Sequence, residues 1–146
     1  MKNKFRCTCP VTSALDILGD KWMLVIIKQM LILKKKTYKD FINSDEGIAT
    51  NILTNKLKLL LEFKIILKIK LSHNKKSAYY YLTQKGLSLT PVLIELLIWG
   101  EENIRNIHPK MAMNDGLENL KLDKGQFIDS LKSNYTNFLK NEEVEF

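Results

Sequence analysis

The hydrophobic pattern of the chain changes its period near the middle, and this change constrains the fold more than any other feature. From about residue 49 to residue 63, apolar side chains recur at the spacing of one helix face. Residues 65–71 then end in alternating apolar and charged side chains. Residues 73–77 have the composition of a turn, and residues 78–83 are rich in tyrosine. Alternation and aromatic side chains are typical of strands. The sequence therefore predicts a helix that leads directly into a β-hairpin.

Three further helices are predicted before this one. The first starts near Pro10 and ends at Gly19, which we expect to form a left-handed cap. The second, residues 21–31, is apolar nearly all round and is expected to be buried. The third starts at Thr37, because a threonine followed three residues later by an acid, Asp40, resembles a capping box. Its inward-facing side chains are expected to be Tyr38, Phe41 and Ile42.

Beyond the hairpin, the sequence predicts a long helix and then an extension. The long helix follows Gly86 and tolerates Pro91 only in its first turn. The composition changes after residue 107, so we divide the chain into residues 1–107 and an extension of residues 108–146. The extension has one predicted amphipathic helix, around residues 127–139, and an acidic end expected to fray. We expect its apolar face to extend a dimer interface; the alternative is that it covers the core of its own chain.

This order of elements is that of a winged helix-turn-helix. The predicted fold class is mainly α with a small β-hairpin, with flanking N- and C-terminal dimerisation helices. In this architecture one helix, here residues 49–63, enters the major groove of double-stranded DNA, whose width matches an α-helix. The chain contains no stretch near the roughly 18 apolar residues of a membrane span, and its charged N-terminus lacks the apolar run of a signal peptide. A cytoplasmic location without membrane contact is therefore expected.

Positive charge is concentrated in the predicted DNA-binding part. Between Lys21 and Lys85 the chain has 14 lysines and 4 acidic residues, a net charge of +10, whereas residues 108–146 carry 5 basic and 7 acidic residues. The formal charge of the whole chain is +7. A basic middle segment favours a polyanionic partner. The alternative is a solvated, lysine-rich surface without a partner.

The period of the predicted reading helix assigns its two faces. The core side would hold Ile52, Leu53, Leu57 and Leu60. The side toward DNA would hold Thr50, Asn51, Thr54, Asn55 and Lys58. Asparagine can pair with adenine, a threonine methyl can contact thymine, and lysine suits phosphate. Alternatively, Thr50 only caps the helix and the two asparagines are ordinary surface residues.

Further lysines are candidate DNA contacts outside this helix. Lys75 and Lys76 lie at the predicted hairpin tip, where a wing would reach the minor groove or the backbone. Alternatively, they only keep the turn soluble. Lys39 belongs to a second basic cluster, which also contains Lys34, Lys35 and Lys36. Whether that cluster reaches phosphate stays open at this point.

Several blocks of sequence together resemble the HxlR-type transcription regulators. They occur in the family's order, cover roughly residues 7 to 105, and comprise residues 9–11, 14–22, 45–57, 81–86, 91–93 and 99–100. The resemblance implies a winged helix related to the MarR group, a homodimer formed by the terminal helices, a roughly two-fold symmetric operator and no catalytic activity. The dimerisation residues that follow from it are Leu93, Leu96, Leu97 and Trp99.

Two features depart from the family pattern. Lys64 stands where the family usually has a glycine, so the turn into the wing must place a lysine in a conformation that glycine adopts more easily. The segment after about residue 107 extends past the usual family core, and the resemblance assigns it no role.

The two cysteines, Cys7 and Cys9, have two interpretations. Some members of the resembled family sense oxidants or electrophiles through the cysteine before Pro-Val, here Cys9. Its place ahead of a helix and near Arg6 favours a thiolate. A disulfide between Cys9 and Cys7 would close a small and strained ring. Oxidation is therefore expected to form a disulfide between subunits or a mixed disulfide. The alternative is a half-buried cysteine that packs against the helix start.

Other functions receive less support from the sequence. Cys7, Cys9, His73 and His108 match no familiar zinc spacing, so no metal or cofactor is expected. Neither histidine is flanked by a plausible nucleophile and acid, and no Gly-rich phosphate loop is present, so no enzyme is expected. The main alternative is a winged-helix protein-interaction module. Strong salt dependence distinguishes binding to DNA from binding to a protein partner. The expected mode of action is repression by promoter occupancy, with a small-molecule or electrophile effector.

Overall fold

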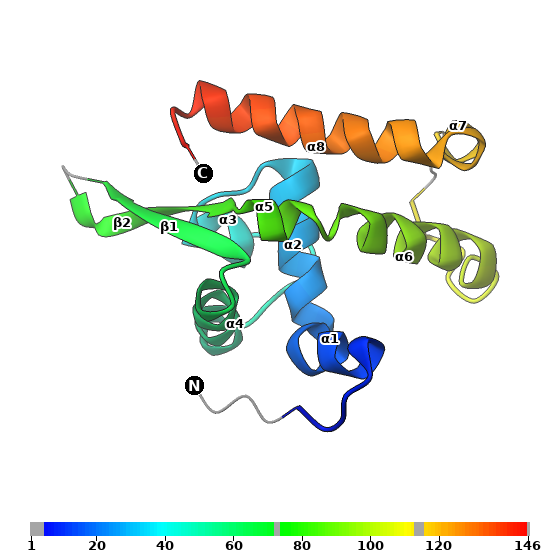
Figure 1. Ribbon diagram of the computed structural model, residues 1–146, viewed down its shortest axis with the longest axis horizontal. Helices are drawn as coiled ribbons and strands as arrows, with labels where there is room; N and C mark the ends of the chain where they lie inside the picture. The colour runs from blue at the N-terminus through cyan, green and yellow to red at the C-terminus, as the bar shows by residue number, and fades with distance from the viewer. Residues whose placement is uncertain (1–4, 72–73, 113–115, 146) are drawn as a thin grey trace.

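The computed structural model describes residues 5–71, 74–112 and 116–145 and places α2 at the centre of the molecule, with α1 at one end and α8 across the other (Figure 1). The elements in chain order are α1 (Pro10–Leu18), α2 (Lys21–Leu33), α3 (Tyr38–Ile42), α4 (Thr50–Glu62), β1 (Ile66–Leu71), β2 (Asn74–Leu82), α5 (Gln84–Leu87), α6 (Thr90–Asn103), α7 (Leu117–Leu122) and α8 (Lys124–Asn141). The predicted fold class, mainly helical with one hairpin, is confirmed. None of the described helices is long and apolar enough to cross a membrane.

Helix α2 is buried, as its sequence predicts. Its core side chains are Met23, Ile26, Ile27, Met30 and Leu31. The Asp20 carboxylate caps the first turn by accepting hydrogen bonds from the N–H groups of Trp22 (2.7 Å) and Met23 (3.1 Å). An acceptor at this position satisfies N–H groups that have no partner within the helix. The helix ends at Lys34, whose φ of 55° is left-handed.

Helices α3 and α4 form the helix-turn-helix. The predicted capping box is present: Asp40 N–H donates to the Thr37 hydroxyl, and Thr37 N–H donates to the Asp40 carboxylate, both at 3.0 Å. Phe41 is buried, whereas Tyr38 and Ile42 are half-buried. On α4, the buried side chains are Leu53, Leu57 and Leu60, and Ile52 is half-buried. The predicted assignment of the two faces of α4 is therefore confirmed.

The wing is an antiparallel pair, with Ile66 opposite Leu82 and Ile69 opposite Tyr79. Strand β2 already begins at Asn74, so the predicted turn over residues 73–77 is too long. The pairing is irregular between Lys70 and Leu71, and this irregularity accommodates the longer strand.

The predicted left-handed backbone conformation is present at Lys64 but not at Gly19. Lys64, between α4 and β1, has a φ of 58°, which confirms the expectation that a lysine must adopt a conformation favoured by glycine. Gly19 has a φ of −74°, so the predicted left-handed cap is wrong. Space explains the glycine instead, because a Cβ at Gly19 would lie 2.2 Å from the carbonyl oxygen of Leu15.

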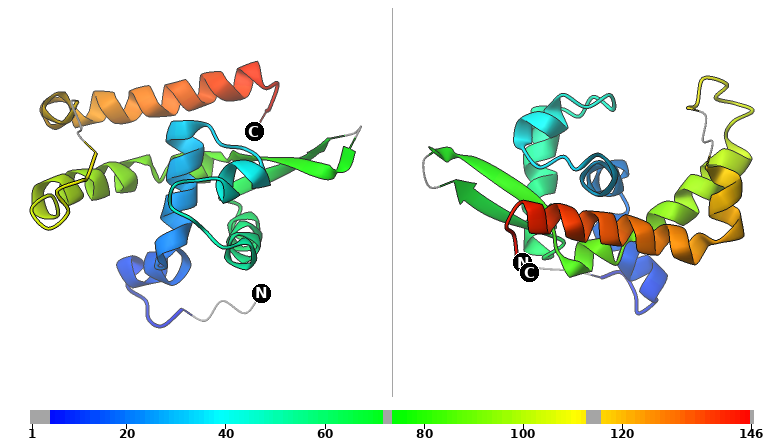
Figure 2. Two further views of the ribbon diagram at one scale, coloured as in Figure 1. Left: turned by 180° about the vertical axis from the view of Figure 1, so that it is seen from behind. Right: turned by 90° about the horizontal axis from the view of Figure 1, so that it is seen from above.

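The extension contains two helices, α7 and α8, not the single helix predicted, and α8 packs on its own chain (Figure 2). Tyr135, Leu139 and Val144 are buried in the core. The expectation of a dimer-extending apolar face and a frayed end is therefore wrong for these residues. A two-stranded hairpin is stable only when another element packs against its apolar face. Helix α8 covers part of this face through the contact between Tyr81 and Phe138.

Candidate nucleic-acid interface

The exposed face of α4 carries polar side chains only a few residues apart. All five predicted reading residues are exposed: Thr50, Asn51, Thr54, Asn55 and Lys58. The leucines on the opposite face hold the helix against the core, so these side chains are presented outward on a rigid element. Amide, hydroxyl and ammonium groups in this arrangement suit contacts to base edges and phosphates.

A hydroxyl cluster connects α3 to this face. Tyr38 OH donates to the carbonyl oxygen of Thr50 (2.9 Å) and lies 2.9 Å from Thr54 Oγ1, which also donates to the Thr50 carbonyl (2.9 Å). The hydroxyl protons are therefore satisfied within the protein, and Thr54 keeps mainly acceptor capacity and its methyl group for a ligand. Sequence reasoning placed Tyr38 in the core and missed this role; the tyrosine hydroxyl itself was the available signal.

An ion pair ties α4 to α2. Lys56 Nζ lies 2.5 Å from Asp20 Oδ2, and Asp20 is the residue that caps α2. Burial raises the pKa of Asp20, but the hydrogen bonds from Lys56 and from the N–H groups of Trp22 and Met23 outweigh it and hold the pKa below its ordinary value. This contact, which the sequence did not reveal, joins the middle of the reading helix to the start of α2.

The basic cluster at residues 34–36 is largely used inside the protein. Lys36 Nζ pairs with Glu142 at 2.5 Å and lies 4.4 Å from the centre of the Tyr79 ring. Lys34 Nζ donates to the Leu31 carbonyl at 2.5 Å, and burial lowers its pKa. Both ammonium groups are therefore engaged in internal contacts. Lys39, by contrast, is exposed on α3.

The wing supplies two described lysines that the sequence analysis did not single out. Lys68 and Lys70 lie on β1, and their alternation with apolar residues was the signal that could have found them. Lys70 is exposed, and Lys68 Nζ lies 5.7 Å from the centre of the Tyr80 ring. Lys75 and Lys76 lie in β2, but their side chains are outside the described part of the structure, as is His73 entirely.

The predicted dimerisation residues divide into two groups. Leu96 and Trp99 on α6 are 51% and 58% exposed, whereas Leu93 and Leu97 are half-buried. Two apolar residues of α1, Val11 and Leu15, are also exposed. A cluster of large exposed apolar side chains, such as the one on α6, is typical of a surface that another chain covers.

Both cysteines are exposed, so the interpretation of Cys9 as a half-buried packing residue is wrong. Arg6, expected near the thiol, pairs instead with Asp16 at 2.5 Å. Cys9 is the N-cap residue of α1, so its thiol lies at the end of the helix where the first N–H groups have no partner within the helix. The N–H and hydroxyl of Thr12, followed by the N–H of Val11, favour the thiolate and hold the pKa of Cys9 below its ordinary value.

A helix-turn-helix with one polar exposed helix face, followed by a hairpin wing, defines a winged helix-turn-helix protein. The chain belongs to the HxlR-like helix-turn-helix family, which matches residues 17–108. Its class is therefore that of the HTH-type transcriptional regulators, which bind DNA and are not enzymes. The match ends before α7, so the two helices of the extension lie outside it.

Named relatives agree with this assignment. The HTH-type transcriptional regulator YodB from Bacillus subtilis is 30% identical over 95 residues, which cover 64% of this chain and 84% of YodB. The B. subtilis HTH-type regulator YdeP is 32% identical over 94 residues, covering 64% and 73% of the two chains.

Solved structures of redox regulators are similar as well. The reduced form of B. subtilis YodB has a TM-score of 0.54 and 26% identity, and covers 67% of this chain and 96% of its own. The oxidised form of the redox regulator HypR has a TM-score of 0.57 and 29% identity, covering 65% and 97%.

Proposed function

We propose that the protein is a repressor that binds a roughly palindromic operator as a homodimer, with α4 of each subunit in the major groove and the wing beside it. The observation that carries the proposal is the α4 face, where five polar side chains are exposed above a buried row of leucines. Occupation of promoter DNA by such a dimer is the simplest mode of action. Two such helices about 34 Å apart would read half-sites one turn of duplex apart.

The apolar surface on α6 and α1 supports a dimer. Trp99 and Leu96 project from α6, and Leu15 projects from α1. Each of these side chains is already about half buried, so covering its exposed half contributes about 0.8–1.5 kcal/mol. A symmetric contact that uses these residues on both subunits would therefore stabilise a homodimer.

Oxidation of Cys9 is the signal that we propose for this regulator. The thiol is exposed and its pKa is lowered, which are the properties of a reactive cysteine. Similarity to YodB, solved in reduced and diamide-treated forms, and to the redox regulator HypR supports this proposal. Oxidation to an intersubunit or mixed disulfide would alter α1, the helix that follows Cys9 and that contributes to the proposed dimer surface.

The test is binding of the purified protein to DNA upstream of its own coding region, titrated with salt and with or without diamide. A dimer making about 6 to 10 phosphate contacts should lose roughly a thousandfold or more in affinity between 50 and 200 mM salt. Loss of binding in diamide that Cys9→Ser prevents would support the redox role. Binding that is absent or insensitive to salt would contradict the proposed function and favour a protein partner.

A further inference from the structure

The last turns of the chain contact the base of the wing. Tyr135, in α8, is fully buried, and its hydroxyl oxygen accepts a hydrogen bond from the backbone N–H of Leu82 at 2.8 Å. Leu82 is the last residue of β2 and lies opposite Ile66, the first residue of β1. Burial raises the pKa of Tyr135 to about 12, so the hydroxyl stays neutral. A buried backbone N–H at the base of the hairpin is therefore satisfied by the extension.

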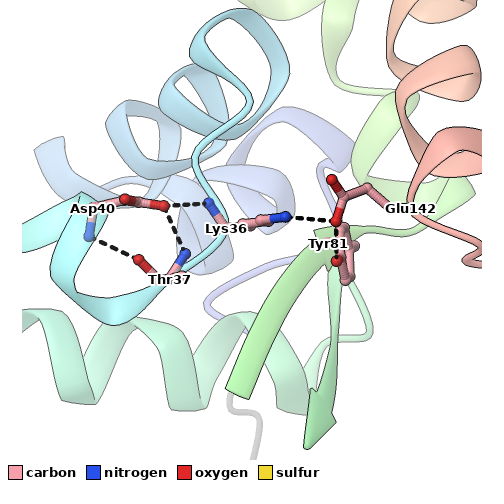
Figure 3. A network of polar contacts seen from close by, with 5 residues as sticks. All are labelled: Lys36, Thr37, Asp40, Tyr81 and Glu142. Carbon is pink, nitrogen blue, oxygen red and sulfur yellow. Dashed lines mark hydrogen bonds and ion pairs between the residues drawn. The ribbon is translucent and has the colours of Figure 1, made fainter. Parts of the chain in front are cut away.

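Glu142 makes a second connection at the same place (Figure 3). Its carboxylate lies 2.5 Å from Lys36 Nζ and accepts a hydrogen bond from Tyr81 OH at 3.0 Å. The carbonyl oxygen of Lys36 in turn accepts a hydrogen bond from the N–H of Tyr80 at 2.7 Å. The segment between α2 and α3, strand β2 and the end of α8 are thus joined in one polar network.

Aromatic packing surrounds these polar contacts. The Phe138 ring of α8 lies 6.2 Å from the Tyr81 ring and 5.5 Å from the Tyr135 ring, centre to centre. Tyr81 and Tyr135 are both buried, with 1% and 0% exposure. Buried rings in contact restrict the movement of the strand that carries them.

We propose that the C-terminal extension positions the wing, with Tyr135 and Glu142 as positioning residues that raise DNA affinity without touching DNA. The inference rests on the proposed function, because it assumes that the wing contacts DNA. A two-stranded hairpin is only marginally stable alone, and a small rotation at its base moves its outer end by a larger distance. Fixing the base before binding removes part of the ordering cost of association.

The test compares Glu142→Gln with Glu143→Gln, which makes the same change in charge one residue away. Removing a negative charge should by itself strengthen DNA binding equally in both variants. A third variant, Tyr135→Phe, changes no charge and removes only the acceptor for Leu82 N–H. Amide exchange is measured first in the DNA-free protein, with the amides of α2 reporting whether the core is intact.

We expect the amide of Leu82 to exchange about five- to 150-fold faster in Tyr135→Phe, the fold-change that corresponds to leaving a buried N–H without its acceptor. In Glu142→Gln, β2 amides should exchange faster than in Glu143→Gln while α2 amides stay unchanged. DNA affinity should fall relative to Glu143→Gln, because the wing must then be ordered on binding. For each phosphate contact that the less ordered wing also loses, the slope of log affinity against log salt should become shallower by about 0.9. A decrease in the amount of folded protein alone would leave that slope unchanged.

Equal exchange and equal salt slopes in Glu142→Gln and Glu143→Gln would overturn the inference. Faster exchange of β2 without any difference in DNA binding would also overturn it, because the extension would then stabilise the wing without affecting affinity. If the unmodified protein shows no salt-dependent DNA binding, the proposed function fails instead. The exchange measurements on the free protein would still decide whether the extension holds the wing.

Discussion

Replacing Lys64 by glycine should stabilise the protein. Lys64 has a φ of 58°, and this left-handed region costs a residue with a Cβ about 1–2 kcal/mol. Its neighbours impose the conformation, since Lys64 N–H donates to Leu61 O (3.0 Å) and Lys64 O accepts from Thr83 Oγ1 (2.7 Å). Glycine avoids the cost but gives the unfolded chain more freedom, at about 0.5–1 kcal/mol. The midpoints of these two ranges differ by about 0.75 kcal/mol, so this is the expected net gain in unfolding free energy, and it corresponds to a rise in Tm of about 1–4 °C.

The measurement is urea-induced unfolding followed by circular dichroism, with Lys64→Ala as the matched control. Alanine removes the same exposed side chain but keeps the Cβ, so it should give no gain. The midpoint should rise for Lys64→Gly at an unchanged slope, because the surface exposed on unfolding stays the same. An equal gain in both variants would refute the reasoning, since the benefit would then come from removal of the lysine side chain.

Three further predictions concern the reading helix and the subunit contact. Because the pKa of Asp20 is held below its ordinary value, its pair with Lys56 contributes stability in full above about pH 4 and loses it as pH falls through the folded-state pKa. Asp20→Asn keeps the N-cap of α2 but removes the titrating carboxylate. The decrease in unfolding free energy from pH 7 to pH 3, measured by urea unfolding, should therefore be smaller in this variant. An equal decrease would contradict the assignment. Tyr38→Phe should leave the circular dichroism spectrum intact yet weaken operator binding about two- to tenfold, because the Thr50 carbonyl loses the hydrogen bond from Tyr38 that fixes the first turn of α4; unchanged affinity would show that the cluster does not orient this turn. Trp99→Asp should yield folded monomers in sedimentation experiments, and a persistent dimer would place the subunit contact elsewhere.

Local signals were enough to predict much of the fold and one face of the site. The periodic leucines of α4 place its polar residues on the outside without knowledge of any partner element. The capping box between Thr37 and Asp40 also depends only on residues close in sequence. The strain at Lys64 was predictable because the family that the chain resembles usually has a glycine there.

Long-range contacts account for the errors. The sequence pattern around Gly19 predicts a left-handed cap, whereas a close approach to the Leu15 carbonyl explains the glycine. Nothing near Lys36 in sequence indicates its pairing with Glu142, so the sequence groups Lys36 with a basic cluster whose contact with phosphate stays open. The amphipathic pattern of α8 shows that one face is buried, but it does not say whether the covering surface belongs to the same chain.

The position of α8 also affects how the chain folds. The ion pair between Lys36 and Glu142 joins residues 106 positions apart, and the hydrogen bond between Leu82 and Tyr135 joins residues 53 positions apart. Contacts across such long loops carry a high entropic cost of closure and tend to form late. The helix-turn-helix, built from nearer contacts, can therefore assemble before the extension docks. Contacts that are absent from the folding transition state slow unfolding without speeding folding, so docking of α8 adds kinetic stability to the finished wing.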